Sequence, residues 1–384
     1  MEADINKLPD SLPEFLEMLK NNSKINSSDY GNLVNRYLDT KAREKLMPMN
    51  GKFELTPVCN LDCKMCYVHL NKDQIKSSQL LSTEDWKSLF KQAIDSGMMQ
   101  AEISGGECLT YPGFDELYLY LQSYGVETIV FTNGLLLDDK RIEFFKANPS
   151  KFIQVTLYGS CEDAYERVTG HRAFNRVYTN ILKAKDAGLP VKLAITPNAF
   201  MGDDGKKVVK AAFDTGLQMR INYNLIDPYE DTGRHGMELD ASLDQYVEMN
   251  RYYSELRNIN VIPVDETSLP DLGSESDGKE YGVRCGAGRS AFSINWKGEM
   301  YPCLSLYKIK PAFPLRDGFK KAWEQTTGFS SEYMRPVECV NCEYKNVCLS
   351  CAALHYQKDN PGHANKQICE RTKRMVKEGI LKLV

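Results

Sequence analysis

The sequence lacks any long apolar run: no stretch of its 384 residues approaches the length that a bilayer-spanning helix needs. Its opening residues 1–10, MEADINKLPD, also lack the basic start and the apolar stretch of a secretory signal. These absences argue against a membrane protein and predict a location in the cytoplasm. The length suits one large domain with an appendage, or two domains.

An excess of positive charge is missing too. The formal net charge is −4, whereas proteins that bind a phosphate backbone usually carry a basic field. We therefore expect no nucleic-acid partner. Residues 366–384 are locally basic, and we interpret them as a solvated helix face rather than a docking surface for an acidic partner.

Cysteine, in contrast, is abundant, with twelve residues. In a reducing compartment, clustered thiols more often bind metal or carry out redox chemistry than form stable disulfides. Cys108 and Cys161 stand alone. The other thiols form a first cluster of Cys59, Cys63 and Cys66, and a second of Cys285, Cys303, Cys339, Cys342, Cys348, Cys351 and Cys369.

Along the chain, compact β-branched or aromatic segments alternate with helical stretches. The predicted strands are residues 51–57, 99–105, 126–132, 151–158, 191–197 and 218–226. The helices predicted among and after them are residues 82–97, 114–125, 138–147, 175–188, 204–216 and 242–258, preceded by short polar helices at 11–20 and 30–46. Ser82 and Asp138 are suitable N-caps, and several helices end at glycine (Gly97, Gly125, Gly188, Gly216).

Six strand–helix repeats with short linkers predict the α/β class, with a parallel sheet and right-handed crossovers. A partial (β/α)6 TIM-like barrel fits best, and a flat doubly wound sheet is the alternative. We expect an N-terminal helical extension (1–48), the barrel (49–240), a bridging helix and linker (241–280) and a cysteine-rich domain (281–384). A hairpin turned at Lys297 and Gly298 opens that last domain.

The first cysteine cluster follows the first predicted strand, and in either fold chemistry gathers at the carboxyl ends of the strands. Three thiolates can hold three corners of a cubane iron–sulfur cluster and leave one iron open to a small molecule. An incomplete zinc site, with His69 as a further ligand, is the competing interpretation.

The stretch CNLDCKMCY, residues 59–67, resembles the CX3CX2C signature of the radical S-adenosylmethionine (SAM) enzymes, and a GGE motif follows the second strand. In that family the open iron binds the amino and carboxylate groups of SAM, and an electron from the cluster cleaves SAM to methionine and a 5′-deoxyadenosyl radical. The resemblance implies that Gly105, Gly106 and Glu107 receive the methionyl ammonium, since glycines permit close approach and a carboxylate suits a cation.

The same resemblance also assigns four further residues to parts of SAM. Thr156 would face the ribose, Arg167 the SAM carboxylate, and Leu225, on the sixth strand, would line the adenine. Met65 stands where relatives usually have an aromatic residue against the adenine, a place that a flexible thioether can also fill.

The second cysteine cluster resembles the SPASM extension of radical SAM enzymes, which carries two auxiliary [4Fe–4S] clusters, so that we expect three clusters in all. The resemblance assigns Cys285, Cys303 and Cys351 to the first auxiliary cluster, and a second set to the other: Cys339, Cys342, Cys348 and Cys369. With seven thiols for two four-ligand sites, the first auxiliary cluster has an open iron or a ligand such as Asp277 or Glu280. A zinc ribbon is the alternative for this segment alone.

Each of the two single thiols has a structural interpretation, and Cys108 also has a functional one. Cys108 directly follows Glu107, where it could donate a hydrogen atom to a substrate radical. A buried cysteine is, however, a common small apolar filler. Cys161, in the loop after the fourth strand, has the same structural interpretation, that of a small apolar filler.

These resemblances imply an enzyme that abstracts hydrogen from a peptide or protein substrate, with an electron donor such as flavodoxin or ferredoxin. Formation of a thioether or carbon–carbon crosslink in a ribosomally made peptide is the leading hypothesis. The alternatives are formylglycine formation, as in sulfatase maturation, oxidation of a small molecule, and a non-catalytic metal-binding scaffold. Leu304 follows Cys303, where sulfatase-maturing relatives have an aspartate base.

Overall fold

The computed structural model describes most of the chain. The described residues are 9–21, 30–68, 70, 72–77, 80–222, 225–226, 228–229, 240–258, 282–283, 285–348, 350–356 and 362–382.

One sheet, in the order β6-β5-β4-β3-β2-β1-β7-β8, organises the molecule. Neighbouring strands from β6 to β7 are parallel, and only β8 runs antiparallel to its neighbour. The strands are β1 (Asn50–Glu54), β2 (Gln100–Ser104), β3 (Glu127–Thr132), β4 (Phe152–Thr156), β5 (Val191–Ile195), β6 (Met219–Ile221), β7 (Ala291–Ile294) and β8 (Met300–Tyr301).

The helices of the N-terminal and central parts are α1 (Leu12–Asn21), α2 (Tyr30–Glu44), α3 (Lys72–Ser77), α4 (Thr83–Asp95), α5 (Phe114–Ser123), α6 (Asp139–Ala147), α7 (Glu162–Thr169), α8 (Phe174–Asp186), α9 (Gly205–Asp214) and α10 (Leu243–Leu256). Those that follow are α11 (Pro314–Asp317), α12 (Phe319–Glu332), α13 (Val337–Val340), α14 (Ala352–Tyr356) and α15 (Lys366–Lys377). Short 3₁₀ turns are η2 (Cys108–Thr110), η3 (Ala199–Asp204) and η4 (Leu304–Leu306). In the part of the chain that the structure describes, no helix combines the length and the apolar character needed to cross a bilayer.

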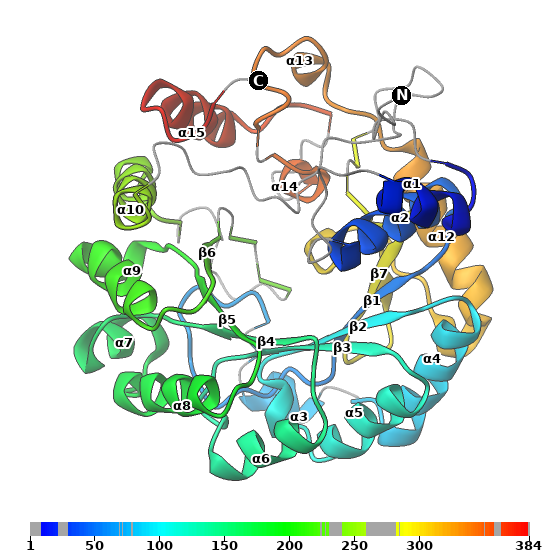
Figure 1. The fold of residues 1–384 in the computed structure, drawn as a ribbon, viewed down its shortest axis with the longest axis horizontal. Coiled ribbons are helices and arrows are strands. Elements are labelled where there is room, and N and C mark those ends of the chain that lie inside the picture. The colour runs from blue at the N-terminus through cyan, green and yellow to red at the C-terminus, as the bar shows by residue number, and fades with distance from the viewer. Residues whose placement is uncertain are drawn as a thin grey trace.

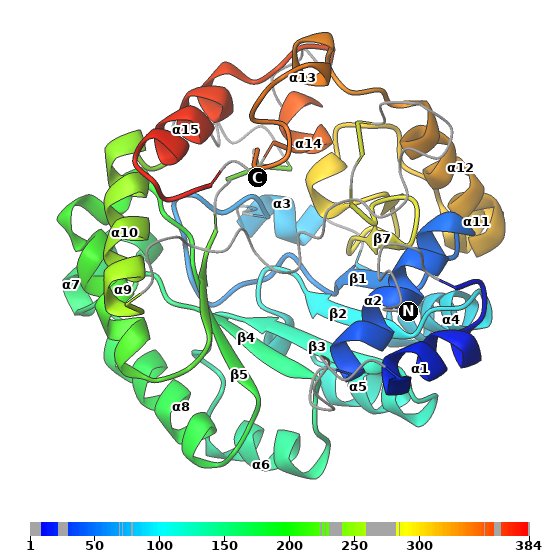
Figure 2. The same ribbon diagram turned by 45° about the horizontal axis from the view of Figure 1, so that its top comes forward.

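The sheet is an arc with α4, α5, α6, α8 and α9 along its convex side (Figure 1). A doubly wound sheet would reverse its strand order and carry helices on both faces. Here β1 to β6 follow one another without reversal, and this confirms the partial TIM-like barrel. Helices α10 and α15 contact each other, and α14 and α15 lie on the open side of the arc (Figures 1 and 2).

Local sequence signals explain where the helices begin and end. Ser82 and Asp85 form a capping box at α4, and the Asp138 side chain accepts a hydrogen bond from the Arg141 N–H at 3.0 Å. Each predicted terminal glycine has the left-handed backbone that favours this residue: Gly97, Gly125, Gly188 and Gly216. These predictions are confirmed. Helix α7, for which no range was predicted, begins directly after Cys161, which lies in the loop after β4 as the N-cap residue.

The predicted hairpin is confirmed as β7 and β8, with Gly298 at φ +77° in the turn. Its place in the fold is new, because β7 pairs in parallel with β1, with Asn50 opposite Ala291. Main-chain hydrogen bonds therefore cross the domain boundary predicted at residue 281, and the C-terminal segment shares the sheet of the barrel. The boundary itself stays a prediction.

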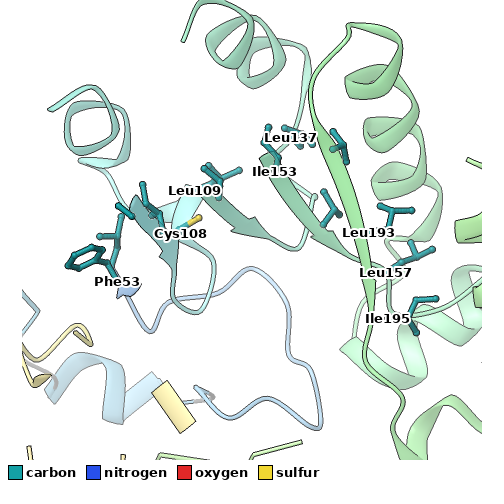
Figure 3. Packing of buried hydrophobic residues seen from close by; sticks show 14 of the residues in the cluster. Phe53, Cys108, Leu109, Leu137, Ile153, Leu157, Leu193 and Ile195 are labelled. Carbon is teal, nitrogen blue, oxygen red and sulfur yellow. The ribbon is translucent and has the colours of Figure 1, made fainter. Parts of the chain in front are cut away.

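The convex face of the sheet packs against the helices as one hydrophobic layer. Phe53 of β1 is fully buried and contacts the rings of Phe90, Trp86 and Phe292 at centroid distances of 4.8, 6.1 and 5.7 Å. Leu109, Ile153 and other residues shown in Figure 3 continue the same core. Since side chains alternate along a strand, Lys52 and Glu54 point to the opposite, inner face.

Strand six is shorter than predicted. Its pairing with β5 ends at Ile195 opposite Ile221, after which Asn222 donates one more bond to the Ile195 carbonyl at 2.7 Å. Pro197 has no N–H with which to continue the ladder. The placement of Leu225 on this strand was therefore wrong: Leu225 lies beyond the end of β6, although it is buried in the core.

Candidate functional site

The loop that carries the first cysteine cluster follows β1 and is held from two sides. The amides of Gly106 and Glu107 donate to the carbonyls of Thr56 and Val58 at 2.7 and 2.9 Å. At the other end, main-chain bonds of 2.9 and 3.0 Å join residues 62 and 64 to residues 169 and 168, at the end of α7. The turn after β2 and the end of α7 thus fix this loop at the carboxyl edge of the sheet.

The three thiols of this loop are near neighbours in a shielded place. Burial raises the pKa of the Cys59 thiol to about 12, and the neighbouring Cys66 raises it further. Burial also raises the pKa of Cys63 well above its ordinary value, with Cys66 and Cys59 as further causes. Thiols with a high pKa stay protonated unless a cation stabilises their thiolates.

Hydrogen-bond donors surround the sulfur of Cys59. The Leu61 amide donates to Cys59 Sγ at 3.4 Å, and Asn133 Nδ2 lies 3.7 Å from the same sulfur. Among the described residues, the buried Nδ2 of Asn60 has no hydrogen-bond partner. This surplus of donors suits sulfur atoms that carry negative charge, as the thiolate and sulfide atoms of an iron–sulfur cluster do.

The two glycines of the GGE motif are required by the packing of the chain against itself. A Cβ atom on Gly105, whose φ is +137°, would lie 2.5 Å from the Thr56 carbonyl oxygen. A Cβ on Gly106 would lie 2.5 Å from the carbonyl oxygen of Pro57 and 2.6 Å from that of Val58. Only glycine lets this turn come so close to the cysteine loop.

Glu107 is 1% exposed and joins the second and third βα connections. Its carboxylate accepts hydrogen bonds from the Asn133 amide at 2.7 Å, the Thr132 hydroxyl at 2.8 Å and the Leu109 amide at 3.1 Å. Burial raises the pKa of Glu107, and these donors oppose the rise. Cys108 Sγ also donates to Oε1 at 3.9 Å. Three of these donors therefore meet Oε1, whereas Oε2 accepts the Asn133 amide alone in the described part of the chain and has an acceptor site left for a cation.

The softer site residues lie at different depths. Thr156 ends β4 and is half-buried, while Met65 and Leu225 are buried, with exposed fractions of 7% and 8%. Arg167 is on the exposed side of α7 and donates from Nη2 to the Met201 carbonyl at 3.4 Å. Their assignment to parts of SAM stays a prediction.

Cys108 lies in the hydrophobic layer between sheet and helices (Figure 3). Its side chain is fully buried, and Sγ donates to the Phe131 carbonyl at 3.3 Å. This surrounding favours the apolar filler, and the role of hydrogen donor stays a prediction. Cys161 is exposed.

The C-terminal thiols fall into two neighbourhoods. Cys285 and Cys351 are exposed by surface area, yet the surrounding protein raises the pKa of both, that of Cys351 to about 12. Cys303 adds to both shifts, so that these three thiols lie near one another.

The second neighbourhood surrounds Cys339. Burial raises the pKa of this thiol to about 11, and three other thiols raise it further: Cys369, Cys348 and Cys342. The Thr372 hydroxyl donates to Cys348 Sγ at 3.5 Å. The assignment of these thiols to two auxiliary clusters stays a prediction, and Asp277, Glu280 and His69 lie outside the described residues.

No set of three or more Cys, His, Asp or Glu side chains among the described residues is arranged to hold one metal ion. Thiolates of a zinc site each lie about 2.3 Å from a single ion, whereas those of a cubane cluster bind different irons.

Sequence reasoning missed a buried polar group on the inner face of β1. Glu54 is fully buried and accepts hydrogen bonds from the Tyr67 and Tyr229 hydroxyls at 2.9 and 2.8 Å. Burial raises the pKa of Glu54 to about 7, although the hydrogen bonds from the two hydroxyls lower it. Charged residues at alternate positions of β1, Lys52 and Glu54, were the available signal, because strands of a parallel barrel are usually apolar on both faces.

Comparison with known proteins decides what this arrangement is. The Radical SAM superfamily matches residues 53–212, which include the first cysteine cluster and the GGE motif. Residues 53–212 therefore form a radical SAM domain. The chain is an enzyme of the radical SAM class, which uses SAM and a [4Fe–4S] cluster.

Three similar radical SAM proteins extend the likeness beyond the barrel. The antilisterial bacteriocin subtilosin biosynthesis protein AlbA of Bacillus subtilis is 26% identical over 392 residues, covering 97% of this chain and 81% of AlbA. The PqqA peptide cyclase of Rhizobium meliloti is 24% identical over 346 residues, covering 85% of this chain and 88% of the cyclase. Streptococcus suis SuiB bound to SAM has a TM-score of 0.64 at 18% identity, covering 93% of this chain and 86% of SuiB. SuiB has also been solved bound to the precursor peptide SuiA.

Proposed function

We propose that this radical SAM enzyme forms a thioether or carbon–carbon crosslink in a ribosomally made peptide, with a SPASM domain as its C-terminal part. The observation that carries the proposal is the loop of Cys59, Cys63 and Cys66 packed on the GGE turn. The similarity to AlbA and PqqA peptide cyclase over most of both chains supports the peptide substrate.

Cys59, Cys63 and Cys66 would hold the cluster, and the turn at Gly105, Gly106 and Glu107 would receive the ammonium of SAM. When bound, the cluster and SAM supply a carbon radical that removes a hydrogen atom from an unreactive C–H bond. The described residues contribute position and shielding. The Asn133 and Leu61 donors favour the charged form of the Cys59 sulfur, and Glu107 keeps a buried negative charge for a cation.

The C-terminal thiols would hold two auxiliary clusters. The neighbourhood of Cys285, Cys303 and Cys351 supports one of them, and the neighbourhood of Cys339 supports the other. The first lacks a fourth thiol, which suits a substrate cysteine as the missing ligand. We further propose a low-potential electron donor such as flavodoxin or ferredoxin.

Formylglycine formation is the second candidate, favoured by the fold of anSMEcpe, which matches with a TM-score of 0.68 at 17% identity. Leu304 stands directly after Cys303 and begins η4, so this position offers no carboxylate as a base. We therefore rank crosslinking first.

The test is anaerobic. Reconstituted protein, incubated with SAM and dithionite, should yield 5′-deoxyadenosine. Incubation with a short cysteine-containing peptide encoded beside the gene should give a product lighter by two hydrogens. A colourless, zinc-containing preparation without 5′-deoxyadenosine contradicts the proposal, and a formylglycine product supports the second candidate.

A further inference from the structure

Glu54 occupies the last position of β1, on the inner face of the barrel, and no part of its side chain reaches solvent. A buried carboxylate is costly unless donors satisfy it. Its donors among the described residues are two tyrosine hydroxyls from other segments, Tyr67 at 2.9 Å and Tyr229 at 2.8 Å. Glu54 therefore joins three separate segments of the chain.

Each tyrosine leads to a different cysteine cluster. Tyr67 directly follows Cys66. The Tyr229 hydroxyl lies 3.3 Å from the carbonyl oxygen of Leu304, which directly follows Cys303. One short path, through two hydroxyls and one carboxylate, thus connects the first cysteine loop with the C-terminal thiols.

Tyr229 is held firmly in this path. Its amide donates to the Tyr67 carbonyl at 2.8 Å. Its ring packs against those of Tyr67, Trp296 and Tyr307 at centroid distances of 5.6, 5.3 and 4.5 Å. The β7–β8 hairpin and the segment after it therefore pack against the ring of Tyr229, whose hydroxyl donates to Glu54.

This hydrogen-bond path has two forms, which differ in whether the Glu54 carboxyl is ionised or protonated. Tyr229 has one hydroxyl proton, which an ionised Glu54 attracts more strongly than the Leu304 carbonyl does. A protonated Glu54 can donate to the Tyr229 oxygen, and the hydroxyl is then available to Leu304. Of the titratable groups around this carboxyl, Tyr67 and Tyr229 bond to it, Tyr301 of β8 is close enough to feel its charge, and the Lys52 and Glu102 pair lies on the same inner face at 2.8 Å.

We propose that Glu54 is a positioning residue that, through Tyr67 and Tyr229, couples the Cys66 end of the first loop to the Cys303 segment. Its protonation then tunes the reduction potential of the metal centre bound there. The inference rests on the proposed function in requiring metal centres at both places. A nearby negative charge stabilises the oxidised form of a cluster, since reduction adds a further negative charge.

The experiment is a redox titration of the anaerobically reconstituted enzyme, followed by electron paramagnetic resonance at about pH 6 and about pH 8. Loss of a signal in Cys303→Ala identifies the C-terminal centre. In the wild type its potential should fall as the pH rises and Glu54 ionises. In Glu54→Gln it should stay constant and lie above the wild-type value at the higher pH.

A second variant keeps the test valid if Glu54→Gln does not fold. Tyr229→Phe preserves the ring contacts and removes only the hydroxyl, so amides of residues 300–307 should exchange with deuterium about tenfold faster. Tyr118→Phe is the matched control, because Tyr118 is buried and its hydroxyl donates to the carbonyl of Asn148, the C-cap residue of α6 at the convex side. It should leave exchange of residues 300–307 unchanged.

Two failures can be told apart. A wild-type preparation that binds no iron or produces no 5′-deoxyadenosine refutes the proposed function. If the wild type is active but the potential of its C-terminal centre does not change with pH, or if Tyr229→Phe exchanges like Tyr118→Phe, the coupling through Glu54 is refuted.

Discussion

Asn133 Nδ2 donates a hydrogen bond to Asn60 Oδ1 at 2.7 Å, which ties the end of β3 to the loop of the first cysteine cluster. The Asn133 carbonyl oxygen of the same side chain accepts from the Leu135 amide at 2.9 Å. This asparagine therefore fixes both its own turn and the position of Cys59.

Replacing Asn133 by alanine should destabilise the protein by roughly 1–3 kcal/mol, because it leaves buried partners unsatisfied. Denaturant unfolding measures the change, and the iron content after reconstitution should fall with it. Asn148→Ala is the control, since that side chain donates to the Phe144 carbonyl at the end of its own helix, away from the cysteine loop. Equal iron content in the two variants would contradict the link to Cys59.

Substituting Gly105 or Gly106 by alanine should displace the cysteine loop, because each new Cβ would lie 2.5 Å from a main-chain oxygen of residues 56 or 57. We expect poor cluster reconstitution, measured as iron per chain. Gly328→Ala is the matched control: Gly328 lies within α12 with open space around it. There alanine should stabilise the helix by up to about 1 kcal/mol.

Combined replacement of Cys59, Cys63 and Cys66 by alanine should remove about four irons per chain and abolish 5′-deoxyadenosine formation. Cys161→Ala should change neither quantity, since this exposed thiol makes no capping hydrogen bond to α7. Iron analysis and chromatography of the nucleoside are the measurements. Full 5′-deoxyadenosine formation by the triple variant would place the reactive cluster elsewhere.

The stability of the protein should depend on Glu54 between about pH 5 and pH 7. Burial raises the pKa of its carboxyl from 4.5 to about 7, so the folded state holds a proton that the unfolded state has released. Stability therefore falls as the pH rises through this window, by up to about 3 kcal/mol. Glu54→Gln should remove this fall, and a parallel decline in both proteins in urea unfolding would contradict the assignment.

Cys108→Ala tests the hydrogen-donor hypothesis. Because the thiol is fully buried and bonded to the Phe131 carbonyl, we expect a loss of about 1 kcal/mol in unfolding free energy and unchanged product. Cys108→Ser, which keeps a donor for that carbonyl, separates packing from chemistry. Loss of product with continued SAM cleavage in both variants would instead support the donor.

The sequence allowed prediction of features that depend on neighbouring residues. The strands of the barrel have β-branched and aromatic segments, and Ser82 and Asp138 cap their helices through backbone amides three residues away. The cysteine loop and the GGE motif were recognisable for the same reason. Their proximity followed from the parallel topology, which brings the ends of successive strands to one edge.

Features that depend on distant pairing were not predictable. Glu54 and Tyr229 are separated by 175 residues, and no local pattern announces that a strand carboxylate will meet that hydroxyl. The end of β6 depended on Pro197, just beyond the neighbouring strand β5, which is why Leu225 was assigned to the wrong element. The parallel pairing of β7 with β1 likewise required knowledge of where the hairpin docks.

That pairing has a consequence for how the enzyme is made. Until residues 291–294 leave the ribosome, β1 has β2 on one side only, and its other edge offers unpaired amides and carbonyls to any passing strand. During most of its synthesis, the barrel therefore has an unpaired strand edge beside its first cysteine loop. Truncated chains that end before β7 should aggregate. Metal insertion should cause the least aggregation after β7 has paired with β1.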